Sequence, residues 1–251
     1  MNGTHCRTYS CGHRCQGRAL ASCQGTPLAV IYNLMKNRDY KEFSPGVIAH
    51  IYNRGNNKEK IFWDEQDYKV FLFRVGMVLG LKQDNLRKEK LLSLPHSRIR
   101  IDAESDLFKL HAFCLMPNHF HLLVEQCKNE PISKFILKIC TSYTMYINKK
   151  YKRVGHLFQD RFKSNLIEDN PQLMWTSAYI HMNPVKDKLV NSPENYEWSS
   201  YKDYIGKRNL PITSTNLLID IFGDKDSFVK ETLNYFSKED SDMPRHALGS
   251  F

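Results

Sequence analysis

The stretch that most constrains the fold of this chain is residues 115–124, LMPNHFHLLV. Pro117 and Asn118 are typical turn residues, and the apolar run that follows them is typical of a short strand. Side chains along a strand alternate between the two faces of a sheet, so His119 and His121 are predicted to share one face. Two neighbouring imidazoles can supply half of a divalent-metal site. The simpler alternative is a pair of surface histidines that alternate with apolar residues and bind nothing.

The composition indicates a well-packed protein with a basic surface. The chain has 251 residues, of which 41% are hydrophobic, enough for one large domain or one domain with extensions. The formal net charge of +9 makes nucleic acid the default partner of a protein of this size. No apolar run approaches the roughly 18 residues of a membrane helix, so we expect a cytoplasmic, nucleoid-associated protein without membrane contact.

Hydrophobic periodicity and turn residues predict an alternating order of strands and helices. The predicted strands are 47–52, 109–115, 119–124 and 162–167, and the predicted helices are 64–80, 132–151 and 172–183. Asp64 is a candidate N-cap, and Pro184 is expected to end or kink the last helix because proline lacks a backbone N–H. This order is that of a ferredoxin-like α+β fold.

In a ferredoxin-like sheet the helices cover one face and leave the other open. The apolar residues Phe120, Leu122 and Val124 are therefore assigned to the helix face. His119 and His121 are assigned to the open face. The aromatic residues of the segment 193–204 are expected to pack over the last helix.

The composition divides the chain into three parts. Residues 1–34 have few periodic apolar positions and lack the paired cysteines of a zinc site, so we expect a disordered or mis-called leader. Residues 35–208 form the expected folded domain, in which the highly charged stretch 82–106 is interpreted as a loop or an insertion. Residues 209–251 form an expected C-terminal extension, with one short helix through apolar positions between 222 and 236 and a frayed tail.

Residues 131–165 hold eight Lys or Arg side chains against one acidic residue, Asp160. Tyrosines and phenylalanines are interleaved with these charges, as in grooves that bind phosphates and stack bases. The alternative is a solvated helix face without a partner. The residues predicted to contact DNA are Arg54, Lys134, Lys138, Lys149, Lys150, Arg153, Arg161 and Lys163.

Tyr179 is a candidate nucleophile because of its position near the end of the last predicted helix. Tyr179 and Asn183 are four residues apart and therefore share one helix face. That face could bring a phenol and an amide oxygen to a metal held by the histidine pair. The alternative is that Tyr179 packs in the core beside Trp175 and Met182.

Four motifs within residues 45–204 resemble those of the HUH single-tyrosine transposases, and most closely their REP-associated branch. They are YNRGNN at 52–57, MPNHFH at 116–121, GHLFQDRFK at 155–163 and YIHMNP at 179–184. The resemblance implies a Tyr179 nucleophile, with Mg²⁺ or Mn²⁺ held by His119, His121 and Asn183. It also implies cleavage and rejoining of single-stranded or hairpin DNA through a covalent 5′-phosphotyrosine. His181 stands where the family often has an aromatic or aliphatic residue, and it is not assigned to the metal.

Two other functions remain open at the level of the sequence. A relaxase or replication initiator would use the same metal and tyrosine, although the short length and the lack of a helicase segment weigh against it. A ferredoxin-like nucleic-acid-binding module would act without catalysis. Retention of His119, His121, Tyr179 and Asn183 argues against such a module. A monomer and a homodimer are both compatible with the sequence.

Overall fold

A computed structural model of the chain describes residues 44–82, 85 and 106–234. The expectations for residues 1–34 and 237–251, and for nearly all of the stretch 82–106, lie outside the described residues. The described elements follow the predicted order of strands and helices, and further helices come after the last strand. Within the described residues, no helix combines the length and the apolar character needed to cross a membrane.

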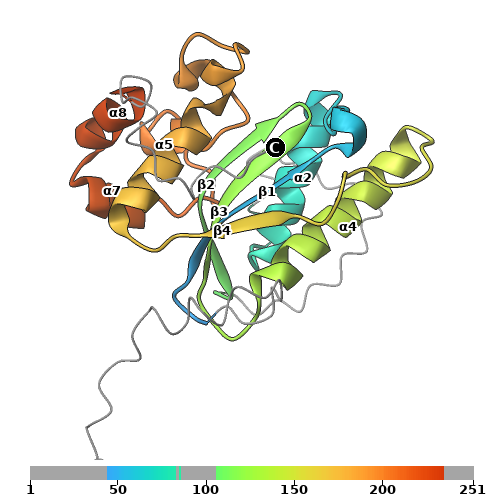
Figure 1. Ribbon diagram of the computed structural model, residues 1–251, viewed down its shortest axis with the longest axis horizontal. Helices are drawn as coiled ribbons and strands as arrows, with labels where there is room; N and C mark the ends of the chain where they lie inside the picture. Colours follow the sequence, from blue (N-terminus) through green and yellow to red (C-terminus); the bar gives the residue numbers. More distant parts are fainter. Residues whose placement is uncertain (1–43, 83–84, 86–105, 235–251) are drawn as a thin grey trace, which may run out of the picture. The chain divides into compact units, whose positions relative to one another are not determined.

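A four-stranded antiparallel sheet forms the centre of this part of the chain (Figure 1). Its strands are β1 (Ile48–Arg54), β2 (Phe108–Met116), β3 (His119–Gln126) and β4 (Lys163–Leu166), in the spatial order β2-β3-β1-β4. β1 runs antiparallel to both of its neighbours, with Arg54 opposite His119 and Tyr52 opposite His121 on β3. The topology confirms the predicted ferredoxin-like α+β fold.

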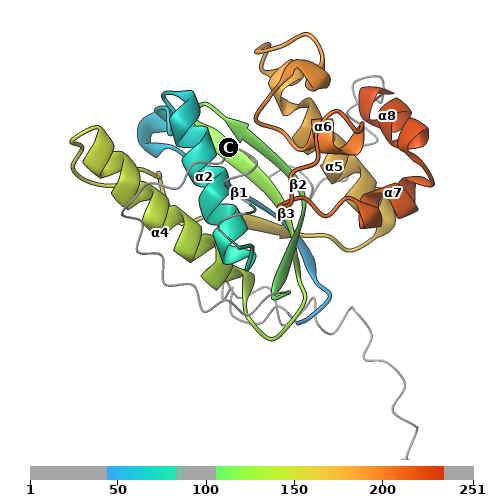
Figure 2. The same cartoon turned by 180° about the vertical axis from the view of Figure 1, so that it is seen from behind.

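Helices α2 (Glu65–Val78) and α4 (Ile132–Lys150) cover one face of the sheet, the face turned to the viewer in Figure 2. Asp64 caps α2 as predicted, in a reciprocal capping box with Asp67 that satisfies open N–H groups at the helix start. The core on this face joins both helices to alternate residues of the strands. Its members from β3 are Phe120, Leu122 and Val124, so their predicted orientation is confirmed.

The opposite face of the sheet is also covered, and the expectation of an open face is wrong. Helix α5 (Asn170–Lys186) packs against β2 and β3, with an apolar cluster between them. The sheet residues of this cluster include Ala112, Cys114 and Leu123, and they explain why the face is covered. β2 and β3 carry apolar side chains on both faces, which is typical of strands buried on both sides. His119 and His121 lie on this covered face and are 7% and 0% exposed.

Helix α5 continues through Pro184 to Lys186, so the expectation that it ends near Asn183 is wrong, and the alternative of a kink at Pro184 stays a prediction. A proline at this position removes one backbone hydrogen bond, the one that residue 184 would donate to the carbonyl of Ile180. The loss falls in the last turn of the helix, where little helical hydrogen bonding follows. The extra turn carries Lys186 and the capping residue Asp187 beyond Asn183.

The remaining elements are short, and all but η1 follow α5 in the chain. They are η1 (Asn56–Lys58), η2 (Pro193–Asn195), α6 (Tyr201–Tyr204), α7 (Asn216–Phe222) and α8 (Lys225–Leu233). The helix expected between 222 and 236 is α8. The unpredicted α7 precedes it and ends at Gly223, whose φ of +92° favours glycine. The tyrosines of the segment 193–204 pack with α5 in the second cluster, as expected.

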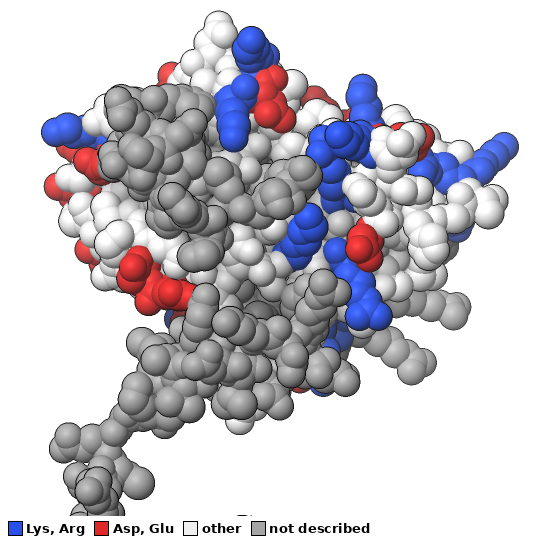
Figure 3. Space-filling view, in the orientation of Figure 1, with Lys and Arg blue, Asp and Glu red and all other residues white. Residues whose placement is uncertain are grey.

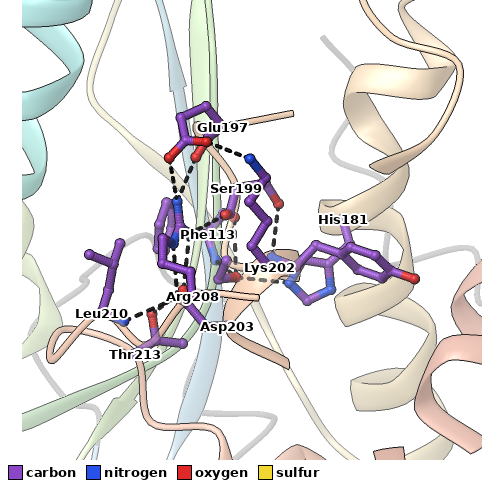
Figure 4. A network of polar contacts seen from close by, with 11 residues as sticks. Phe113, His181, Glu197, Ser199, Lys202, Asp203, Arg208, Leu210 and Thr213 are labelled. Carbon is purple, nitrogen blue, oxygen red and sulfur yellow. Dashed lines mark hydrogen bonds and ion pairs between the residues drawn. The ribbon is translucent and has the colours of Figure 1, made fainter. Parts of the chain in front are cut away.

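A network of polar contacts fixes the segment after α5 to the rest of the fold (Figure 4). Ser200 Oγ accepts the backbone N–H of Phe113 in β2 at 2.9 Å and lies 2.8 Å from Nε2 of His181 in α5. Arg208 pairs with Asp203 at 2.9 Å in the same network. His181 therefore has a structural partner, in agreement with its exclusion from the predicted metal ligands.

Candidate functional site

His119 and Asn183 meet where the start of β3 faces the end of α5. Nε2 of His119 lies 3.5 Å from Oδ1 of Asn183, and Nδ1 lies 2.6 Å from Oδ1 of Asn118. The hydrogen bonds made by the amide nitrogens of Asn118 and Asn183 determine which way each side-chain amide points. Asn118 Nδ2 donates to the carbonyl of Lys58, and Asn183 Nδ2 donates to the carbonyl of Tyr179. In a neutral His119 ring, Nδ1 therefore carries the proton and Nε2 presents a lone pair.

This arrangement fits a divalent cation. Burial lowers the pKa of His119 to about 4, although hydrogen bonding to Asn183 and the charge of Asp187 act in the opposite direction. The imidazole is therefore neutral near pH 7, and its lone pair faces the amide oxygen of Asn183. Imidazole nitrogen and amide oxygen are both ligands of divalent metals, and they repel each other unless a positive charge lies between them. Within the described residues, no cluster of three or more His, Cys, Asp or Glu that could hold a metal ion is present, at this site or elsewhere.

His121 lies beside His119 on the same face of β3, as predicted. The centres of the two rings are 5.1 Å apart. Nδ1 of His121 lies 2.9 Å from Nε2 of His50 in β1, a residue that sequence reasoning did not single out. Burial holds the pKa of His121 well below its usual value and lowers that of His50 to about 3. These neutral imidazoles are in the protonation state that binds metals.

Tyr179 reaches the histidine pair from α5. Its ring centre is 5.4 Å from that of His121, and the ring also stacks on Trp175, with 5.6 Å between centres. Burial raises the pKa of the phenol, while a side-chain hydrogen bond with Asn183 acts to lower it. Nζ of Lys186, another residue that the prediction missed, lies 5.4 Å from the centre of the ring. The phenol is thus protonated near pH 7, and a cation lies beside it.

Asp187 is an acidic residue of the site that sequence reasoning did not find. Its negative charge acts to raise the pKa of Tyr179 and opposes the lowering of the His119 pKa by burial. Asp187 stands four residues after Asn183 and continues the helix face that Tyr179 begins. The helical spacing could have predicted it, but the expected end of the helix at Pro184 excluded it.

Several of the residues predicted to contact DNA have acidic partners within the protein. Lys150 is the most strongly held, because it pairs with both Asp64 and Asp67 at 2.7 Å. Lys134 pairs with Glu130 at 3.0 Å, and Arg153 pairs with Glu59 at 3.6 Å. In the same positively charged part of the fold, Lys149, Arg161 and Lys163 are exposed, and Lys138 and Arg54 are partly exposed.

Figure 3 shows Lys and Arg side chains gathered in a band over β4 and the adjoining part of α4. Beside this band a hollow of about 440 Å³ is lined by Thr144 and residues 155–161. In that segment the N–H of Gln159 donates to the carbonyl of Arg54 at 2.9 Å, and Arg54 lies opposite His119 in the sheet. The hollow therefore begins about two strand spacings, roughly 10 Å, from the histidine strand.

Comparison with known proteins relates this site to one family. Residues 78–183 match the family model described as "Transposase IS200 like". The chain is 30% identical over 107 residues to a putative REP-associated tyrosine transposase of Haemophilus influenzae. That match covers 38% of this chain and 59% of the relative, so it spans about three fifths of the relative's length.

A solved structure described as a REP-associated tyrosine transposase bound to a REP hairpin is 17% identical, with a TM-score of 0.48. The match covers 69% of this chain and 87% of that one. The family-model match contains both the His119–His121 strand and the helix of Tyr179 and Asn183. The predicted resemblance is confirmed: in the segment that builds the site, this chain is similar to the IS200-like transposases and to a REP-associated tyrosine transposase.

Proposed function

We propose that this protein is a transposase-type endonuclease that cleaves and rejoins single-stranded DNA through a covalent 5′-phosphotyrosine at Tyr179. The observation that carries the proposal is the position of Asn183, whose amide oxygen lies 3.5 Å from Nε2 of His119 and whose Nδ2 donates to the backbone carbonyl of Tyr179. A candidate metal ligand and a candidate nucleophile from distant parts of the chain thus share one partner. The similarity of residues 78–183 to IS200-like transposases supports the same class of reaction.

His119, His121 and Asn183 are the proposed ligands of Mg²⁺ or Mn²⁺. The support is the opposed pair of lone-pair donors, Nε2 of His119 and Oδ1 of Asn183, together with the neutral state of both histidines. A bound cation would stabilise negative charge on a nonbridging phosphate oxygen and orient the phosphate. Imidazole binds Mn²⁺ more tightly than Mg²⁺, so the supply of the two ions decides which is used.

Tyr179 is the proposed nucleophile. Its phenol oxygen forms a bond to phosphorus while the bond from phosphorus to the 3′ oxygen breaks, and the 3′ oxygen takes up a proton as the phenol loses one. Lys186, beside the ring, stabilises negative charge that develops on the phenol oxygen. The phosphotyrosine keeps the energy of the broken ester bond, so rejoining to a 3′-hydroxyl needs no nucleotide cofactor.

Unpaired or hairpin DNA is the proposed substrate. The basic band over β4 and α4 suits the phosphate backbone, and the hollow lined by residues 155–161 lies next to it. Its lining includes Phe158, Gln159 and Arg161, which offer an apolar ring, an amide and a cation to an exposed base. A base in a duplex is stacked and paired and could not enter such a hollow without unstacking.

The proposal is tested with the full chain, Mn²⁺ and end-labelled oligonucleotides. A hairpin with unpaired flanks should be cut, with protein attached to the new 5′ end at the break and a free 3′-hydroxyl on the other fragment. Chelation of the metal and the variant His119→Ala should each stop the reaction. Cleavage that leaves no protein on either end, or that survives His119→Ala, would contradict the proposal.

A further inference from the structure

His50 contacts a proposed metal ligand without belonging to the ligand set. Its Nε2 lies 2.9 Å from Nδ1 of His121, across the pairing of β1 with β3. The planes of the two rings are 27° apart, with 5.1 Å between their centres, and both rings are buried, with 1% and 0% exposure. The His50 ring also lies 5.1 Å from the ring of Tyr52 and 6.0 Å from that of Tyr179. Packing on several sides therefore holds the His50 ring in place.

The short distance between the two nitrogens requires one proton between them. Each neutral imidazole has one N–H donor and one lone-pair acceptor. If His121 donates from Nδ1, its Nε2 carries a lone pair and can bind a metal. If His50 donates instead, Nε2 of His121 carries the proton and cannot bind. The direction of this single hydrogen bond therefore decides whether His121 is a ligand.

We infer that His50 is a positioning residue, which accepts the Nδ1 proton of His121 and so presents the Nε2 lone pair of His121 to the cation. This inference rests on the proposed metal site. It gives His121 the same tautomer that Asn118 gives His119, whose Nδ1 lies 2.6 Å from the Asn118 amide oxygen. Each ligand ring then has a partner on Nδ1 and its lone pair on Nε2, as metal-binding histidines usually do.

The neighbour of His50 in β4 is Asn165. It lies opposite His50 in the pairing of β1 with β4, so the two side chains extend from the same face of the sheet. Nδ1 of His50 and Nδ2 of Asn165 are both buried and make no hydrogen bond to the described residues. Within the described residues, no other group bonds Nδ1 of His50, so this nitrogen can carry the ring proton. That proton position is the one that the inference requires.

The first test measures the tautomer of His121 directly. In the full-length, metal-free protein with ¹⁵N-labelled histidine, we expect the His121 spectrum of a ring protonated at Nδ1. A ring protonated at Nε2 would overturn the inference. This measurement needs neither a variant nor a bound metal, so it gives a result even if the proposed metal site is wrong.

The second test compares Mn²⁺ affinities, measured by the decrease of the free-ion electron spin resonance signal. His50→Leu should weaken Mn²⁺ binding about 10- to 100-fold, the usual effect of removing a group that orients a metal ligand. His50→Gln keeps an acceptor for the His121 proton and should stay within a few-fold of the unaltered protein. The matched control is His181→Leu, which removes an equally buried histidine that contacts Ser200. The control should bind Mn²⁺ normally.

The outcomes separate this inference from the proposed function. If the unaltered protein binds no Mn²⁺, the proposed metal site is wrong, and the tautomer measurement still decides the role of His50. If the unaltered protein and a folded His50→Leu variant bind Mn²⁺ equally well, the positioning role is wrong and the metal site stands. Equal weakening by His181→Leu would show a general effect of losing a buried histidine, and would also contradict the inference.

Discussion

Nε2 of His119 lies 3.5 Å from Oδ1 of Asn183, although 64 positions separate the two residues in the chain. This contact joins the first residue of β3 to the last turns of α5 and places the helix that carries Tyr179 directly over the histidine pair. The chemistry proposed here depends on that placement. A shift of α5 along the sheet would separate Tyr179 and Asn183 from the two histidines without changing any residue of the site.

Replacement of the two histidines should remove cleavage and also weaken the fold. His119→Ala with His121→Ala removes two buried side chains, so we expect a loss of about 0.5–3 kcal/mol of unfolding free energy at each site. An open sheet face would have tolerated the change at little cost. Metal-dependent cleavage and thermal melting measure the two effects separately. Unchanged cleavage by the folded double variant would contradict the ligand assignment.

Lys150 should contribute to the stability of the fold, whereas its neighbour Lys149 should contribute to DNA binding. Lys150→Ala leaves the fully buried Asp67 without its cationic partner, so we expect a loss of about 3 kcal/mol of unfolding free energy. Lys149→Ala should leave stability unchanged and weaken DNA binding, because the exposed side chain is available for phosphates. Denaturant unfolding and filter binding of the two variants check this difference. Equal stability of the two variants would show that the ion pair with Asp67 is not important.

Acidification below pH 6.5 should destabilise the protein through its buried histidines. An unfolded chain protonates histidine near pH 6.5, whereas burial lowers the pKa to about 3 for His181 and His50 and to about 4 for His119. The unfolded state therefore binds more protons between about pH 6.5 and 4, and stability falls as the pH falls through that window. Above it the contribution is fully present.

The variant His181→Gln isolates one of these groups, because an amide can still bond Ser200. It should reduce the slope of unfolding free energy against pH by about 1.4 kcal/mol per unit below pH 6. Denaturant titrations at several pH values measure the slope. The same slope in both proteins would show that His181 is protonated equally in the folded and unfolded states.

A blunt duplex should resist cleavage by this protein under conditions in which its separated strands are cut. The scissile phosphate must approach the cation while Tyr179 attacks in line, which requires a sharply bent backbone. A duplex would first lose stacking worth about 1.4 kcal/mol for each base-pair step. Binding to the single strand should also weaken as salt rises, since Lys and Arg displace condensed counterions. Equal cutting of both substrates would indicate a conventional duplex nuclease.

The local features of this fold could be predicted from the sequence, and the long-range ones could not. The Asp64 cap and the shared face of His119 and His121 follow from spacing within a few residues. The contact of His50 with His121 needs the register between β1 and β3, and 71 positions separate the two residues. Nothing local in the sequence fixes that register. The apolar residues on both faces of β2 indicate that both faces are covered, but they do not identify the element that covers the histidine face. That element is α5, which lies far along the chain.

The same distinction applies to the site. Tyr179 and Asn183 could be paired because they are one helical turn apart, and the motif resemblance supplied their roles. Asp187 follows the same spacing but stands after Pro184, where a local rule ended the helix. In the folded protein, the packing of α5 on β2 and β3 outweighs the one hydrogen bond that Pro184 removes.

The most direct test of the central claim is to locate the covalent bond between protein and DNA. The full chain is incubated with Mn²⁺ and a hairpin oligonucleotide, digested with a protease, and the peptide that carries the nucleotide is identified by mass spectrometry. We expect the modification on Tyr179, its loss in Tyr179→Phe with DNA affinity kept within a few-fold, and normal modification in the buried-tyrosine control Tyr201→Phe. An adduct on Tyr143, Tyr146 or Tyr151, or cleavage by Tyr179→Phe, would contradict the account.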